Sequence, residues 1–225
     1  DLRGESVADA TGLRKINTEL VRKALRQGGV MSKNDLARET GLSFPTVSRT
    51  VDALVRLGEL REAGAAASTG GRCAQRYERD PRFRVMLCAR LEGRQLFYEV
   101  RDLDGAVLEQ GEQMRSASIL QMLDGMAVRV RETWPNLGGA ALGVDCPLRG
   151  GVVCESVSYQ ELAGVNLSEQ LGRMTGVPSA AVRDMHLASA GYCAREGGWN
   201  GVAVCIYLGP SGMGASTVLD GKAFE

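Results

Sequence analysis

Apolar residues near the start of the chain recur at intervals of three and four positions. This spacing places them along one stripe of a helix with 3.6 residues per turn, and Gly28 with Gly29 supplies the end of that helix. The pattern predicts an amphipathic helix over the segment LRKINTELVRKALRQGG. Its apolar positions are Leu13, Ile16, Leu20, Val21, Ala24 and Leu25.

Two shorter helices follow, separated by a glycine. Ser32 suits the cap of a helix that ends at Gly41, because its hydroxyl can accept from the amide of Asp35 and glycine favours the left-handed position after a helix. The next helix begins at Ser43, with Pro45 in its first turn, and ends at Gly58. Apolar and small residues then pack the pair into a helix-turn-helix. These core positions are Leu36, Ala37, Leu42, Val47, Val51 and Leu54.

The outward positions of the last helix carry short hydroxyls, one aromatic ring and one arginine. Aspartate and glutamate are absent from 43–51, whereas a solvated helix face usually shows Glu and Lys pairs. Hydroxyls, a ring and a guanidinium suit base edges, thymine methyls and phosphates, so this face predicts DNA binding in the major groove. The predicted contacts are Ser43, Phe44, Thr46, Ser48, Arg49 and Thr50.

The segment ELREAGAAASTGGRCAQRYERD reads as two short strands around a flexible tip. Gly70 and Gly71 allow close approach to a sugar-phosphate strand, and Arg72 can enter a narrow minor groove. An ordinary mobile hairpin is the alternative, but its place directly after a helix-turn-helix favours a wing. Lys33, Arg61 and Arg76 are the expected phosphate contacts.

Charge is divided unevenly along a chain whose total is zero. Residues 1–82 contain 15 Lys and Arg against 11 Asp and Glu, whereas the remainder contains 12 against 16. A basic N-terminal module beside an acidic body suits a module that meets phosphate, although many solvated surfaces have a similar balance.

From Val85 onward, three strands precede a helix over 117–134, and strands then alternate with helices over 167–175 and 185–195. The later strands are expected at ALGVD, GVVCESV, PSAAVRD and GVAVCIYLG. This order predicts a mixed sheet with helices packed against it.

The sequence also limits cofactors and location. The cysteines are scattered without a CxxC pair and there is one histidine, so no metal or other cofactor is expected. No apolar run approaches the ~18 residues of a membrane span and no secretory signal is present, so we expect a cytoplasmic protein with reduced, mostly buried cysteines. The cysteines are Cys73, Cys88, Cys146, Cys154, Cys193 and Cys205.

The helix-turn-helix and wing segment resembles the winged helix-turn-helix of ROK-family regulators (repressor, open reading frame, kinase). The resemblance lies in NDLARETGLSFPTVSRTVDALVRLGELRE followed by STGGR. Val85 to Glu225 resembles the ROK domain more loosely, with landmarks at RDLDGAVL and GMGASTVLDGK. The resemblance implies an α/β chain with an arm over 1–11, a winged helix-turn-helix over 12–82, and an actin-like and hexokinase-like ATPase-type body over 83–225. That body is expected to be truncated in its second lobe, and the family's zinc cluster would lie beyond Glu225.

Three departures from ROK kinases bear on function. The family's magnesium-binding aspartate falls on Arg90, which cannot hold a metal. The sugar-binding Asn-Asp pair falls on Arg183 and Asp184. Asp184 can still accept a sugar hydroxyl, or it can simply cap the following helix. LGPSGMGAS differs from the family's phosphate loop and is expected to form a hairpin turn.

The resemblance therefore favours a regulator that binds operator DNA and is not an enzyme. Repression of sugar-metabolism genes, a homodimer or higher homo-oligomer, and a sugar or sugar-phosphate effector are what the resemblance implies. A body that has lost sugar binding and serves only for dimerisation or protein interaction is the alternative. An active sugar kinase is the reading least supported, because of Arg90.

Overall fold

The computed structural model describes residues 2–65, 74–115, 118–154, 156, 158–195, 200–209 and 212–224. The chain divides into two compact units, Asp1–Phe83 and Arg84–Glu225. Each unit has its own hydrophobic core.

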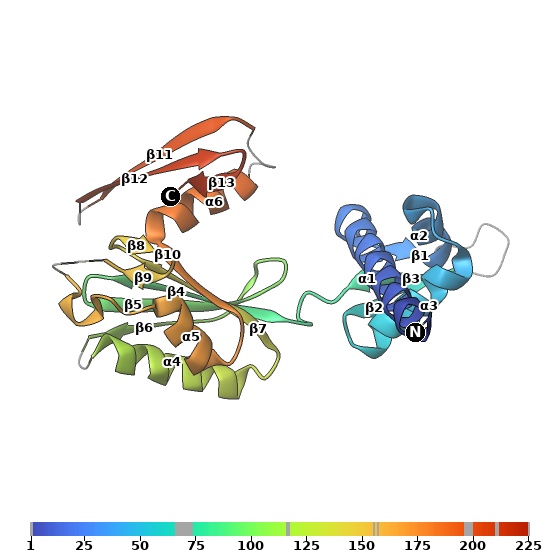
Figure 1. Cartoon of the computed structure of the whole chain (residues 1–225), viewed down its shortest axis with the longest axis horizontal. Helices are drawn as coiled ribbons and strands as arrows, with labels where there is room; N and C mark the ends of the chain where they lie inside the picture. The colour runs from blue at the N-terminus through green and yellow to red at the C-terminus, as the bar shows by residue number, and fades with distance from the viewer. Residues whose placement is uncertain are drawn as a thin grey trace. The chain divides into compact units, whose positions relative to one another are not determined.

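The first unit contains three helices and a small antiparallel sheet (Figure 1). The helices are α1 (Leu2–Gly28), α2 (Lys33–Thr40) and α3 (Phe44–Arg56). The strands β1 (Met31–Ser32), β2 (Leu60–Ala65) and β3 (Gln75–Arg79) pair in the order β1-β3-β2. This is the expected order of a helix-turn-helix followed by two strands.

The core of the first unit is built where the three helices meet. Val21, Ala24 and Leu25 of α1 pack with residues of α2 and α3, and Arg22 donates two 2.6 Å hydrogen bonds to the Glu59 carboxylate just before β2. The remaining core residues are Leu36, Val47, Val51, Leu54, Leu60 and Tyr77, with Ala37 and Leu42 packed against them. The core predicted for α2 and α3 is therefore confirmed.

The stripe predicted along α1 is wrong in its N-terminal half. Leu13, Ile16 and Leu20 are 53%, 58% and 37% exposed. Helical periodicity identifies an apolar side, but it does not say how far along the helix the neighbouring helices extend. The segment 1–11, expected as an arm, instead continues the helix from Leu2 in its backbone. No proline interrupts it, so each further residue extends an existing hydrogen-bond ladder.

The second unit is built on a mixed five-stranded sheet of order β10-β7-β4-β5-β6. β7 pairs in parallel with β4 and β10, whereas β4, β5 and β6 form antiparallel hairpins. The strands are β4 (Val85–Glu92), β5 (Gln95–Asp102), β6 (Val107–Met114), β7 (Leu137–Val144) and β10 (Ser179–Arg183). The predicted mixed sheet is confirmed.

Helices α4 (Ile119–Thr133) and α5 (Leu167–Thr175) cover one face of this sheet (Figure 1). Alternate residues of β4 explain why: Leu87, Ala89 and Leu91 are buried, whereas Cys88 and Arg90 between them are exposed. The polar side of the same strand is therefore available to line a cavity on the opposite face.

On that opposite side lie α6 (Asp184–Arg195) and a three-stranded antiparallel sheet (Figure 1). The buried Ser189 hydroxyl donates to Ser216 Oγ at 3.0 Å, which ties α6 to this sheet. Its strands are β11 (Val202–Gly209), β12 (Gly212–Leu219) and β13 (Lys222–Phe224). Alternate apolar residues of β11 point outward, namely Val202, Val204, Ile206 and Leu208.

Two local predictions in this unit are wrong. The strand expected over 151–157 is represented by β9 (Val152–Val153), which pairs with β8 (Leu148–Arg149) before a 3-10 turn, η1 (Gln160–Leu162). Gly150 and Gly151, both at positive φ, turn the chain there and keep the pairing short. Cys88 and Cys154 are exposed, so the cysteines are not mostly buried; no disulfide is found among the five described ones.

Candidate nucleic-acid interface

The corner between α2 and α3 is held by local caps. Ser32 Oγ accepts from the Asp35 amide at 3.2 Å while the Asp35 carboxylate accepts from the Ser32 amide at 3.1 Å, which closes a capping box. Gly41 takes φ +70°, and its amide donates to Ala37 O at 3.1 Å. Both predicted caps are confirmed, and together they set the direction in which α3 leaves the turn.

Helix α3 turns its apolar residues inward and its polar residues outward. Val47 and Val51 are fully buried, which leaves Phe44 49% exposed, Ser43 and Arg49 exposed, and the remaining hydroxyl residues half-buried. All six predicted contacts, namely Ser43, Phe44, Thr46, Ser48, Arg49 and Thr50, thus lie at or near the start of one helix. Their presentation outward fits the predicted face.

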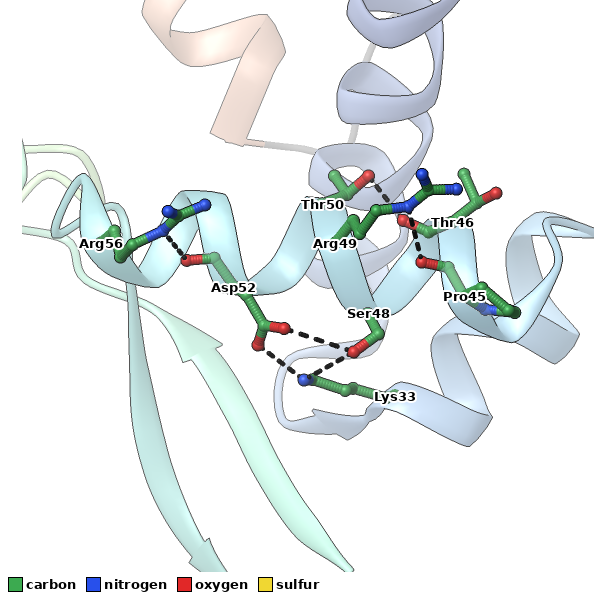
Figure 2. A network of polar contacts seen from close by, with 8 residues as sticks. All are labelled: Lys33, Pro45, Thr46, Ser48, Arg49, Thr50, Asp52 and Arg56. Carbon is green, nitrogen blue, oxygen red and sulfur yellow. Dashed lines mark hydrogen bonds and ion pairs between the residues drawn. The ribbon is translucent and has the colours of Figure 1, made fainter.

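Hydrogen bonds between residues three or four positions apart order the side chains on this face (Figure 2). Thr50 Oγ1 donates to Thr46 O at 2.9 Å, and Arg49 Nε donates to Pro45 O at 3.3 Å. The hydroxyls of Ser43 and Thr46 lie 2.9 Å apart, so Ser43 contacts a side chain instead of capping a backbone amide. The terminal guanidinium nitrogens of Arg49 take no part in the bond to Pro45.

Lys33, a predicted phosphate contact, is already engaged by α3. Its ammonium lies 2.6 Å from Asp52 Oδ1 and 3.0 Å from Ser48 Oγ (Figure 2). It also lies over the Tyr77 ring, 5.6 Å from the ring centroid. The hydrogen bond from Lys33 lowers the pKa of Asp52 below its ordinary value. Sequence reasoning missed Asp52, which lies one position beyond the acid-free window.

The other two predicted phosphate contacts also have internal partners. Arg61 Nε lies 2.8 Å from Glu78 Oε1 across the β2–β3 pair, and Arg76 donates to Val30 O at 2.7 Å. Gly70, Gly71 and Arg72, the predicted tip of the wing, lie outside the described residues. Strands β2 and β3 flank that segment and pair antiparallel, as a wing requires.

A groove of about 700 Å³ lies between α1 and α3. Arg14, Asn17 and Thr18 line it from α1. The lining residues from α3 are Thr46, Arg49, Thr50, Asp52, Ala53 and Arg56. Sequence reasoning missed Arg14, Asn17, Thr18 and Arg56. Their spacing offered a signal, because residues 14, 17 and 18 continue the helical side that carries buried Val21.

In the second unit, Asp184 lines a cavity of about 640 Å³ between the polar side of β4 and α6. Asp184 Oδ1 accepts from the Met185 amide at 2.7 Å, so the carboxylate caps α6, as the simpler expectation held. Burial raises the pKa of Asp184 above its ordinary value. Asp145 lines the same cavity and accepts hydrogen bonds from the Tyr159 hydroxyl and the Gly93 amide.

The residues of this cavity do not fit the magnesium ion that ROK kinases hold. Arg90 stands at the position of the expected aspartate, forms a 3.1 Å ion pair with Glu92 and lies over the Phe97 ring at 5.0 Å. A guanidinium there repels a divalent cation. Among the described residues, no group of three or more His, Cys, Asp and Glu side chains is placed to hold a metal.

Arg183 and Asp184 line different cavities. Arg183 borders a smaller one of about 300 Å³ together with His186, Ser216 and Thr217, whereas Asp184 borders the larger one. The glycine-rich segment LGPSGMGAS is expected to form a hairpin turn. Its two ends do belong to an antiparallel pair of strands, since Gly209 of β11 pairs with Gly212 of β12.

No protein-family model matches the chain, and no curated protein matches it. Solved structures do. A ROK family transcriptional regulator, a homologue of the E. coli MLC protein, superposes with a TM-score of 0.68 over 94% of this chain and 56% of its own, at 20% identity. The chain thus has the mixed α/β fold of that regulator and spans little more than half its length.

Other ROK-family structures match a smaller share of the chain. A ROK family glucokinase from Streptomyces griseus in complex with glucose and AMPPNP gives a TM-score of 0.52 over 62% of this chain and 46% of its own, at 16% identity. A ROK family protein from Streptococcus pneumoniae in complex with sucrose gives 0.53 over 62% and 47%, at 17% identity. Within the described part of the chain, no helix combines the length and apolar character needed to cross a membrane.

Proposed function

We propose that this chain is a transcriptional regulator of the ROK type that reads operator DNA with α3 and carries a body without catalytic activity. The observation that carries the proposal is the outward face of α3, where six hydroxyl, aromatic and guanidinium residues stand together over an acid-free window, 43–51. The likeness to a ROK transcriptional regulator over 94% of the chain supports it.

In this proposal each residue type on α3 has a defined partner in the major groove. Arg49 donates to guanine O6 and N7, Phe44 packs on a thymine methyl, and Thr46 and Thr50 bond to base edges or phosphates. The wing residues Gly70, Gly71 and Arg72 meet the minor groove, and Lys33, Arg61 and Arg76 meet phosphates. Their internal partners hold these last three side chains in place before DNA arrives.

The body pairs two such modules on two half-sites. A homodimer in the cytoplasm would place its α3 helices one or more helical turns apart on a near-palindromic operator. A sugar or sugar phosphate bound beside Asp184 would shift the population between two dimer geometries and thereby release the repressed sugar-metabolism genes. The cavity of about 640 Å³ that Asp184 lines supports this part of the proposal, in which the carboxylate accepts a sugar hydroxyl.

One observation favours a second candidate, a body that pairs subunits but binds no sugar. Arg183 and Asp184 border separate cavities, so they do not form one sugar-binding pair. Calorimetric titration with hexoses and amino sugars separates the two candidates. A saturating heat that Asp184→Ala abolishes supports an effector, and absence of heat supports the pairing body.

The absence of catalysis rests on Arg90. Phosphoryl transfer needs a magnesium ion between the nucleotide phosphates and the protein, and a guanidinium at the end of β4 cannot supply a ligand for it. A coupled assay is expected to detect no sugar-dependent consumption of ATP. Sugar-dependent ATP consumption that disappears when a residue lining the Asp184 cavity is replaced would contradict this part of the proposal.

Capture of genomic fragments tests DNA binding itself. The full chain is immobilised and incubated with sheared DNA from its own genome, and the retained fragments are sequenced. The proposal predicts enrichment of a few fragments, lost in the double variant Phe44→Ala/Arg49→Ala. Uniform retention of the genome by the wild-type chain would contradict sequence reading.

A further inference from the structure

The groove between α1 and α3 gathers three arginines that form no direct ion pair with a carboxylate among the described residues. Arg14 comes from α1, and Arg49 and Arg56 come from α3. In the part of the chain that the structure describes, none of the three lies within 4.0 Å of a carboxylate oxygen. Lys33 and Arg61, by contrast, each form an ion pair. The groove therefore brings together three guanidinium groups that no carboxylate pairs with directly.

Among the residues whose side chains the structure describes, one acidic residue lines the groove, Asp52, and its carboxylate is turned towards Lys33. Asp52 bonds to Lys33 at 2.6 Å and to Ser48 at 3.3 Å on one side of α3. Figure 2 shows Arg49 and Arg56 on the opposite side of the helix from Lys33. Asp52 thus forms its ion pair with Lys33. Arg56 donates to the backbone carbonyl of Asp52 at 3.2 Å, and its charge makes only a minor contribution to the lowered pKa of the Asp52 carboxyl. Three like charges around one concave surface repel unless an anion joins them.

The spacing of the arginines suits a polyanion. Arg49 and Arg56 are two helical turns apart on α3, which is about 10 Å along the axis at 1.5 Å per residue. Arg14 faces them from the other wall, beside the amide of Asn17 and the hydroxyl of Thr18. Guanidinium groups bind phosphate through charge-assisted hydrogen bonds, and the amide and hydroxyl add neutral donors.

We infer that this groove holds the sugar-phosphate backbone of DNA, with Arg14 and Arg56 as phosphate contacts on either wall. The inference rests on the proposed function and extends it. The face of α3 that reads bases would be flanked by a phosphate-binding groove built with α1, a helix to which the sequence assigned no contact. Arg14 and Arg56 then position α3 in the major groove, while Arg49 between them reads a base.

Salt dependence of binding counts phosphate contacts. Each contact adds about 0.9 to the slope of log affinity against log salt, which corresponds to about fivefold in affinity at ~0.15 M salt. A random-sequence duplex of about 30 bp is the suitable probe, because phosphate contacts do not depend on sequence. Fluorescence anisotropy with the full chain measures both the slope and the affinity.

The double variant Arg14→Gln/Arg56→Gln is expected to lower the slope by about 1.8 and the affinity by about thirtyfold at ~0.15 M salt. Arg26→Gln, an exposed arginine in the last turn of α1 and outside the groove, is the matched control and is expected to keep the affinity of the wild type. Arg14→Lys/Arg56→Lys retains both charges and is expected to keep most of the slope. Melting temperatures equal to that of the wild type establish that the variants are folded. If the double variant unfolds, each single Gln variant is measured instead and is expected to lower the salt slope by about 0.9.

The outcomes separate the two claims. A Gln variant with the slope and affinity of the wild type, while the wild type binds the duplex, overturns the groove and leaves α3 untouched. An Arg26→Gln variant that loses as much as each groove variant also overturns it, because the effect is then general charge. A wild-type chain that fails to bind any duplex at ~50 mM salt overturns the proposed function and the groove together.

Discussion

The ammonium of Lys33 lies 2.6 Å from the carboxylate of Asp52, nineteen residues further along the chain. The pair joins the first residue of α2 to the third turn of α3 and is the one ion pair between these two helices in the described part of the chain. It also places a carboxylate next to the proposed DNA-reading face. Asp52 therefore offsets one positive charge that would otherwise attract any DNA.

Asp52→Asn is expected to strengthen binding to random DNA. The change removes the carboxylate that competes with phosphate for the Lys33 ammonium, so the phosphate contact of Lys33 is strengthened and the salt slope rises by up to about 0.9. The exposed pair contributes roughly 0.2–1 kcal/mol, so the melting temperature falls only slightly. Glu39→Gln on α2, an exposed acid outside this network, is the control. An equal gain with both variants would show that the effect is one of net charge alone.

Arg49→Ala is expected to weaken binding to the preferred operator by about 1–3 kcal/mol if the guanidinium reads a guanine. The loss on random DNA should be smaller, because the same side chain there meets at most a phosphate. Anisotropy titrations on a selected and a random duplex measure the difference. Arg26→Ala should leave both affinities unchanged. Equal losses on both duplexes would assign Arg49 to the backbone instead.

Gly41→Ala is expected to destabilise the first unit by about 1–2 kcal/mol, because an L side chain strains a left-handed φ. Gly41 has φ +70° and open space around an added Cβ, so the cost arises from the backbone alone. Gly12→Ala in α1 also has open space and should act in the opposite direction, stabilising by roughly 0.5–1 kcal/mol. Thermal unfolding followed by circular dichroism checks the two signs.

Asp184→Asn is expected to raise the melting temperature of the second unit at neutral pH. Burial raises the pKa of Asp184, so the folded unit holds the proton more tightly than the unfolded chain does. Ionised Asp184 thus costs stability above the folded-state pKa, and the cost disappears below the unfolded value of about 3.9. Asparagine retains the oxygen that caps α6.

The pH dependence separates this effect from a gain in packing. The advantage of Asp184→Asn should shrink as the pH is lowered towards 4, and Asp124→Asn, an exposed acid on α4, should show no advantage at any pH. A pH-independent gain at Asp184 would contradict the desolvation argument.

Features encoded within a few residues were predictable from the sequence. Ser32 and Asp35 close their capping box within one turn, and Gly41 ends α2 without help from distant residues. The inward set of α3 follows from 3.6-residue periodicity for the same reason. These residues determine the turn and the orientation of α3, which is why the candidate interface could be located before its geometry was known.

Features that depend on distant partners were not predictable. The pairing of Lys33 with Asp52 requires α2 and α3 to be docked first, and the groove appears only when α1 packs beside α3. The same reason explains the error at Leu13 and Ile16, since a single helix carries no information on the length of its contact. Residues adjacent in sequence can also line different cavities, as Arg183 and Asp184 do at the junction of β10 and α6.

Selection of preferred sites from a library of random duplexes by the full chain tests most directly whether α3 reads DNA sequence. The account predicts a recurrent motif that the wild type binds with an affinity about 10³-fold or more higher than its affinity for random DNA. The motif selected by Arg49→Ala is expected to lose its base preference at the positions that Arg49 reads. A library without enrichment after repeated rounds, or the same motif recovered at full strength by the Phe44→Ala/Arg49→Ala variant, would contradict it.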